Sequence, residues 1–149
     1  MPEQQTLDRA RRDKRQGKAP STQAGEFVRE EIHHIREGKH GARSTKQAIA
    51  IGLSKARRAG VNLKPPKKGS VSTKTRQSAD RAYKQGQSRS TERPSPKRSR
   101  ATLKVLQQES TAAASSRALS QQARSSARRR SSASRSAAGR KAAKTRAKR

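Results

Sequence analysis

Large apolar side chains are scarce in this chain, and their scarcity limits how much of it can fold. Leu, Ile, Val and Phe together account for 15 of the 149 residues. A highly charged chain with less than roughly 20% of these residues buries too little apolar surface to offset the entropy lost on ordering. We therefore expect a mostly α and disordered chain, in which a small N-terminal helical hairpin is followed by a basic low-complexity tail.

Positive charge is distributed unevenly along the chain. The formal net charge is +29, of which residues 1–60 carry +7 and residues 61–149 carry +22. In the second half only Asp80, Glu92 and Glu109 oppose the cations. A charge excess of this size repels itself and favours a polyanionic partner, which is DNA, RNA, anionic lipid or an acidic protein.

Cysteine and long apolar stretches are both absent. A chain with no cysteine has no disulfides and no thiolate metal sites. Its N-terminus lacks the apolar core of a signal peptide, and no window approaches the roughly 18 apolar residues of a membrane span. We expect a soluble protein of the cytoplasm, associated with the nucleoid.

Composition divides the chain into four segments. A basic N-terminal segment holds a marginal helix capped by Thr6, with Leu7 as its only large apolar residue. The helical hairpin follows and ends before the pair Pro65–Pro66, which favours extended or turn geometry. Next come a basic linker containing Pro, Gly and Ser, with a short helix, and an Ala/Ser/Arg/Lys-rich tail that is partly helical or disordered. The four segments are residues 1–20, 21–64, 65–100 and 101–149.

The hairpin is predicted from two apolar stripes with helical spacing. The first helix covers about residues 22–37, where Ala24 and the large apolar residues between positions 27 and 35 lie along one side of the helix. The second covers about 45–59, because Ser44 and Gln47 have the spacing of a capping box and a glycine at position 60 ends it. The run AIAIGL also fits a buried strand, but the cap and the alanine content favour helix. The expected hairpin core is Phe27, Val28, Ile32, Ile35, Ile49 and Leu53.

Two features of the hairpin leave alternatives open. Glu31 falls inside the apolar stripe, as either a carboxylate at the rim or the partner of a lysine or arginine on the next helix. A hairpin of about 40 residues is also near the size below which a domain needs a metal, a disulfide or oligomerisation. Self-association through Ile51 is therefore one route to a stable fold, and it makes a homo-oligomer a further expectation.

The segment RSTKQAIAIGLSKARRAG, residues 43–60, resembles a bacterial family of small basic proteins of unknown function. Some members of that family carry the name plasmid stabilization protein. The resemblance begins at GEFVREEIHHIREGKHG and runs to the proline pair, with a looser likeness in SPKRSR and the tail. The motif is a specific family signature, and it implies no mechanism. Separately, the tail is similar in composition to linker-histone-like proteins.

Cations of the second half are the candidate nucleic-acid ligands, because each can displace a counterion condensed on a phosphate backbone. The tetrapeptide at 95–98 resembles an SPKK-type turn that enters the minor groove of A·T-rich DNA, or it is a linker turn that touches phosphates only. The candidate nucleic-acid-binding residues are Lys97, Arg98, Arg100, Arg124, Arg128, Arg129, Arg130, Arg135, Arg140, Lys141, Lys144, Arg146, Lys148 and Arg149, with Lys46, Lys55, Arg57 and Arg58 as secondary candidates.

Residues for metal binding, catalysis or base stacking are sparse. His33 and His34 are adjacent on a helix and point about 100° apart, and His40 lies in a glycine-flanked loop, so we expect no metal site. No nucleotide-binding loop, nucleophile elbow or zinc-protease motif occurs, so no cofactor, small-molecule substrate or enzymatic activity is expected. Phe27 is assigned to the core, which leaves Tyr83 as the one candidate for stacking on bases.

These features favour a non-enzymatic DNA-binding protein, nucleoid-associated or architectural, that binds the phosphate backbone largely without sequence specificity. A helix-turn-helix in which Lys46, Gln47 and Lys55 read bases is a variant of this interpretation. DNA is favoured over RNA, although an RNA- or ribosome-associated role is the main alternative, since backbone charge does not discriminate the two polymers. The second alternative is an adaptor that binds acidic proteins or an anionic membrane surface. The tail lacks the Trp, Phe and Leu that an interfacial helix inserts, so we do not expect a membrane partner.

Overall fold

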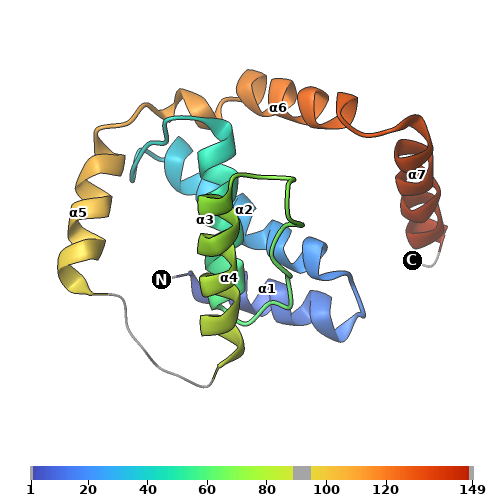
Figure 1. The fold of residues 1–149 in the computed structure, drawn as a ribbon, viewed down its shortest axis with the longest axis horizontal. Helices are drawn as coiled ribbons and strands as arrows, with labels where there is room; N and C mark the ends of the chain where they lie inside the picture. The colour runs from blue at the N-terminus through green and yellow to red at the C-terminus, as the bar shows by residue number, and fades with distance from the viewer. Residues whose placement is uncertain (1, 89–94, 148–149) are drawn as a thin grey trace. The chain divides into compact units, whose positions relative to one another are not determined.

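The computed structural model describes residues 2–88 and 95–147, and all regular secondary structure in these ranges is helical (Figure 1). The chain divides into two compact units, residues 1–115 and 116–149. The first unit holds α1 (Gln4–Arg15), α2 (Pro20–Arg36), α3 (Thr45–Arg58), α4 (Thr73–Gln87), α5 (Pro96–Gln107) and the 3-10 helix η1 (Thr111–Ala114). The second unit holds α6 (Ser116–Arg128) and α7 (Ser132–Ala147).

The ends of the helical hairpin are set by local sequence. The hydroxyl of Ser44 accepts the backbone N–H of Gln47 at 3.2 Å, and the Gln47 side chain accepts the N–H of Arg43 at 2.8 Å. These two bonds confirm the predicted cap of α3. Gly38 and Gly60 follow α2 and α3 with φ of 71° and 86°, a left-handed conformation that glycine adopts without steric cost.

Small residues form the contact between α2 and α3. On α3 the buried apolar positions are Ala48, Gly52 and Ala56, spaced four residues apart. A Cβ atom added to Gly52 would lie 2.6 Å from the Cα of Val28, so the two backbones approach closely at this point. Three of the predicted core residues, Phe27, Ile32 and Ile35, are buried, and the other three, Val28, Ile49 and Leu53, are partly buried.

Helices outside the hairpin complete the core of the first unit. α1 packs against α2, and α4 packs against α3. Ala10 of α1 joins the buried cluster, together with Val61, which follows α3. Thr6, which was expected to cap α1, instead lies fully buried inside the helix, which begins at Gln4. The hairpin therefore has partners within the same chain, and the size argument for self-association no longer applies.

The segment that follows α5 is tied to the turn between α2 and α3. The backbone N–H of Gly41 donates to the carbonyl of Leu106 at 2.8 Å, and that of Ala42 donates to Ser110 at 3.1 Å. The Thr45 hydroxyl donates to the carbonyl of Ala113 at 2.7 Å. Figure 1 shows this segment running beside the turn that precedes α3. Residues 106–114 thus belong to the first unit although the sequence assigned them to the tail.

The expected fold, a small hairpin with a disordered basic tail, is wrong in both parts. The first unit packs α1, α4 and η1 onto the two helices of the hairpin, and the described tail is mostly helical. Alanine, arginine and lysine have high helix propensity, which accounts for helix in a segment with few large apolar residues. Arg135 braces the corner between α6 and α7, because its guanidinium donates to the carbonyls of Ala127 and Arg130 at 3.3 and 3.1 Å.

Candidate phosphate-binding surface and a buried carboxylate–histidine cluster

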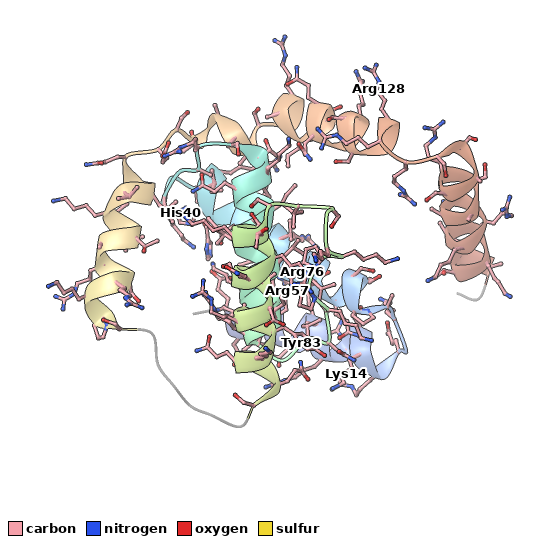
Figure 2. The ribbon with its side chains drawn as sticks, in the orientation of Figure 1. Lys14, His40, Arg57, Arg76, Tyr83 and Arg128 are labelled. Carbon is pink, nitrogen blue, oxygen red and sulfur yellow. The ribbon has the colours of Figure 1, made fainter. Side chains whose placement is uncertain are left out.

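Helix α6 carries a stripe of arginines along one side. Arg117, Arg124 and Arg128 are spaced by seven and four residues, which places them within about 40° of one another around the helix. All three are exposed, and Arg128 is labelled in Figure 2. At a rise of about 1.5 Å per residue, the stripe extends for roughly 16 Å. It is therefore a linear array of guanidinium groups, each able to bind a phosphate.

The cations of α7 surround the helix rather than following one side. Arg140, Lys141 and Lys144 lie roughly opposite Arg135 and Arg146, and every described position of α7 is exposed. Residues 116–149 contain 12 Lys and Arg and no Asp or Glu, a net charge of +12. This unit therefore has no carboxylate of its own with which its cations can pair.

The carboxylates of the first unit, by contrast, are already paired. Each of the nine Asp and Glu residues in the described ranges has a Lys or Arg nitrogen between 2.6 and 3.7 Å away. The first unit still carries a net +17. Its surface therefore offers no isolated acidic group among the described residues. The nine carboxylates are Glu3, Asp8, Asp13, Glu26, Glu30, Glu31, Glu37, Asp80 and Glu109.

The candidate ligands on α5 occupy the first turns of a helix. Pro96 is the first residue of α5 and Ser95 precedes it, so the SPKK-like sequence begins a helix instead of forming an isolated turn. The candidates Lys97, Arg98 and Arg100 are exposed there. Of the other tail candidates, Arg129 and Arg130 lie between α6 and α7, and Arg130 also donates to Ser134. Two candidates, Lys148 and Arg149, lie outside the described residues.

The four secondary candidates on α3 have different environments. Lys46 and Arg58 are exposed. Arg57 is buried, and its Nε donates to the carbonyl of Leu63 at 3.1 Å. Burial lowers the pKa of Arg57 by desolvating its charge. Lys55 lies in ion pairs with Glu30 and Glu31, so Lys55 and Arg57 are engaged inside the fold.

A cluster of charged groups is buried between α2 and α3. The side chains of Glu30 and Glu31 are 2% and 1% exposed, and Nζ of Lys55 lies 3.7 and 2.6 Å from their carboxylates. This contact decides between the two interpretations of Glu31, which pairs with a cation of the next helix. One lysine is shared by two carboxylates, so some of the carboxylate oxygens have no hydrogen-bond donor. Oε1 of Glu30 and both carboxylate oxygens of Glu31 are buried without a hydrogen bond in the structure, although Lys55 neutralises part of their charge.

Two histidines adjoin this cluster. Nε2 of His40 lies 3.3 Å from Oε1 of Glu31, and Nε2 of His34 lies 2.8 Å from Oε1 of Glu3. The bond to His34 lowers the pKa of Glu3, and Lys39 adds to this effect. Metal-ligand atoms of Glu31, His34 and His40 lie within 4.8 Å of one another. His33 points elsewhere and pairs with Glu37 at 3.7 Å.

Nothing in the sequence indicated that His34 and His40 lie together, and the structure brings both next to Glu31 while His33 lies near Glu37. The adjacent histidines diverge on α2 as their spacing requires. The left-handed Gly38 turns the chain back, so that His40 returns to the side of α2 that carries Glu31 and His34. The spacing of Glu31 and His34, three residues apart on a helix, was the signal in the sequence that places both on one side.

A polar cavity of about 170 Å³ opens beside this cluster. Its lining includes Glu3, Glu30 and His34. Arg9 and Arg29 also line the cavity, which lies within the first unit and therefore carries groups of both charges.

The aromatic residues offer little for base stacking. Phe27 is 1% exposed in the core. Tyr83, the other aromatic residue of the chain, donates its hydroxyl to Oδ1 of Asn62 at 2.7 Å (Figure 2). A stacking platform of several aromatic rings cannot be built from this chain.

Comparison with known proteins gives a family match for part of the first unit. Residues 4–69 match a family described as a family of unknown function, DUF6496. The match covers α1, α2, α3 and the segment up to Gly69, and it ends before α4. No curated protein and no solved structure matches the chain. Among the described residues, no helix is long and apolar enough to cross a membrane.

Proposed function

We propose that this protein binds duplex DNA through the phosphate backbone, in a nucleoid-associated or architectural role, without catalysis and largely without base specificity. The observation that supports this most is the composition of residues 116–149, which carry 12 cations and no carboxylate. In the described part of this unit the cations are exposed, and all but Arg129 and Arg130 lie on α6 or α7. Each cation that meets a phosphate releases a condensed counterion, which drives binding without reading sequence.

The side-chain contacts on α3 favour binding of the DNA backbone over reading of the bases. Of the three residues that the helix-turn-helix variant would use, Gln47 caps the helix and Lys55 pairs with buried glutamates. Only Lys46 of these three is exposed. We therefore leave base reading by α3 out of the proposal, and we leave Lys55 and Arg57 out of the proposed phosphate ligands.

RNA remains the second candidate, since a phosphate backbone is common to both polymers. Recognition of single-stranded RNA commonly depends on aromatic rings that stack on splayed bases, and the buried Phe27 and the hydrogen-bonded Tyr83 do not supply such a surface. Duplex RNA is the form that would compete. The similarity of the tail to linker-histone-like proteins favours duplex DNA, and cytoplasmic, nucleoid localisation is proposed with it.

The experiment is a salt titration of binding with the full chain and with a chain that ends at residue 115, the boundary between the two units. Fluorescence anisotropy with duplex DNA should give a steep salt dependence for the full chain. Loss of the second unit should reduce the slope by about 0.9 for each phosphate contact removed. Circular dichroism of the shorter chain checks that α1–α4 are retained.

Parallel titrations separate the candidate partners. The proposal expects duplex DNA to bind more tightly than duplex RNA of the same length and sequence, and both to bind more tightly than anionic vesicles. A preference for RNA would replace the proposed partner with the second candidate. Equal salt slopes for the full and shortened chains would contradict the assignment of phosphate binding to the second unit.

A further inference from the structure

We propose that Glu31, His34 and His40 form a site for one divalent transition-metal ion, with Zn²⁺ as the best match. The three side chains offer one carboxylate oxygen and two imidazole nitrogens, all within 4.8 Å of one another. Imidazole and carboxylate ligands suit Zn²⁺, and three protein ligands leave one position for water. The proposal is independent of DNA binding.

The contact between His40 and Glu31 carries the argument. Nδ1 of His40 lies 3.0 Å from the carbonyl oxygen of Gly41, so this nitrogen carries the proton and donates. In the neutral ring Nε2 then presents a lone pair, and it lies 3.3 Å from Oε1 of Glu31. That oxygen is buried and has no hydrogen bond. Two acceptors that face each other in a buried site repel, unless a proton or a cation lies between them.

Both histidines have the outer contacts that are typical of metal ligands. A histidine that binds a metal through one ring nitrogen usually donates the other N–H to a carbonyl or a carboxylate. His40 meets the carbonyl of Gly41, and His34 meets the carboxylate of Glu3 at 2.8 Å. These contacts fix the orientation of both rings before any ion binds. Lys55 holds the second oxygen of Glu31 at 2.6 Å, which leaves Oε1 for the ion.

The charge of the surrounding groups matches a divalent cation. Four carboxylates and two lysines are linked around the site by ion pairs, and they sum to −2 when both histidines are neutral. A divalent ion brings this sum to zero, whereas one protonated histidine would leave −1. These groups are Glu3, Glu30, Glu31, Glu37, Lys39 and Lys55.

The distances also fit. Zinc bonds of about 2.0–2.2 Å place tetrahedral ligand atoms roughly 3.4 Å apart, so the widest pair must close by less than about 1.5 Å. Side-chain rotation supplies a shift of that size. The cavity of about 170 Å³ reaches one of the three ligands, His34, and its lining includes Arg9 and Arg29 beside the carboxylates of Glu3, Glu30 and Glu37.

A bound ion would join α2 to the turn that follows it. Glu31 and His34 belong to α2, while His40 precedes the residues Gly41 and Ala42 that hold the segment 106–114. The ion would therefore stabilise this turn and the segment docked on it. Its expected role is structural, and its removal should loosen both.

The test uses the full chain without an affinity tag, stripped of metal by a chelator. Isothermal titration with Zn²⁺ should give one site per chain, and Co²⁺ should give the visible absorption of a tetrahedral complex. His34→Ala, His40→Ala and Glu31→Gln should each weaken Zn²⁺ by at least about 100-fold, since even outer contacts of metal ligands are worth 10–100-fold. His33→Ala is the matched control and should bind as the wild type does.

A measurement on the wild-type chain guards against variants that fail to fold. In ¹⁵N spectra of the histidine rings, Zn²⁺ should shift the nitrogens of His34 and His40 and leave those of His33 unchanged. Thermal unfolding should move upward with Zn²⁺ in the wild type and in His33→Ala. Absence of stoichiometric Zn²⁺ binding by the wild type would overturn the proposal and assign His40 a proton shared with Glu31. Ring shifts confined to His33 would overturn it equally.

Discussion

Glycine and alanine, more than large apolar residues, bring the helices of the first unit together. At Gly52 the backbone of α3 meets that of α2, and at Gly86 the backbone of α4 meets the carbonyl of Arg57. Close approach of this kind lets many backbone atoms make van der Waals contact without bulky side chains. A chain with few large apolar residues can therefore still pack a core, which composition alone did not indicate.

Gly52→Ala should destabilise the first unit. The added Cβ would lie 2.6 Å from the Cα of Val28, and overpacking of this kind costs about 1–3 kcal/mol. That cost exceeds the gain of about 1 kcal/mol from replacing glycine in a helix. Gly25→Ala on α2 is the matched control, because nothing lies within 4 Å of its added Cβ and it should stabilise. Thermal unfolding followed by circular dichroism compares the two variants. Equal shifts of the unfolding temperature would show that the backbones of α2 and α3 do not approach closely at Gly52.

The ion pairs of the buried Lys55 lead to a second prediction at the scale of residues. Lys55→Met removes the cation that serves Glu30 and Glu31, leaving the buried Glu30 without a basic partner and Glu31 with His40 alone. Breaking a buried pair in this way costs on the order of 3–5 kcal/mol. Lys46→Met, on the exposed side of the same helix, should change stability little. Denaturant unfolding in the presence of a chelator measures both, and a loss below about 1 kcal/mol for Lys55→Met would argue against the pair.

At the scale of elements, the two helices of the hairpin could be predicted from the sequence. The helices and segments that pack against them could not. The predicted ranges 22–37 and 45–59 fall within two residues of α2 and α3, because caps and glycine stops are local signals. The docking of residues 106–114 depends on backbone hydrogen bonds between segments about 65 residues apart. The spacing of apolar residues along the sequence carries no information about a contact of this kind. The helices of the tail were missed because disorder was inferred from composition, while helix propensity pointed the other way.

Gly41→Ala should release the segment 106–114 without unfolding the hairpin. A Cβ at this position would meet the carbonyl of Glu109, so the segment must move away from the turn. The N–H of Ala42, which donates to Ser110, then loses its acceptor. Hydrogen exchange should accelerate at Ala42 while amides inside α2 and α3 keep their protection. Gly139→Ala, whose added Cβ meets nothing within 4 Å, should leave exchange at Ala42 unchanged.

The candidate sites also differed in how far sequence could locate them. The cationic tail is a compositional feature, so its candidate residues were chosen from the amino-acid sequence alone, and their role stays a prediction. The carboxylate–histidine cluster depends on the turn after α2 bringing His40 back to Glu31, which only the fold supplies. Pairing of Glu31 with Lys55 was one of two open interpretations, and the packing of α3 on α2 decided it.

At the scale of the whole molecule, the two units use their charge in different ways. The first unit engages nine described carboxylates in internal ion pairs and retains +17, while the second has +12 and no carboxylate. Cations that have no acidic partner within their own unit remain available to an external polyanion. The proposed division of labour is therefore a folded first unit and a phosphate-binding second unit.

The most direct test of this division compares two triple variants of equal charge change in the full chain. Arg117→Gln, Arg124→Gln and Arg128→Gln together remove the arginine stripe of α6, while Lys74→Gln, Arg76→Gln and Arg81→Gln together remove three exposed cations of α4. The measurement is the slope of duplex DNA affinity against salt, by fluorescence anisotropy. The α6 variant should lower the slope by up to about 2.7, or 0.9 for each phosphate contact, while the α4 variant keeps nearly the wild-type slope. A larger loss in the α4 variant, or the same loss in both, would contradict the account.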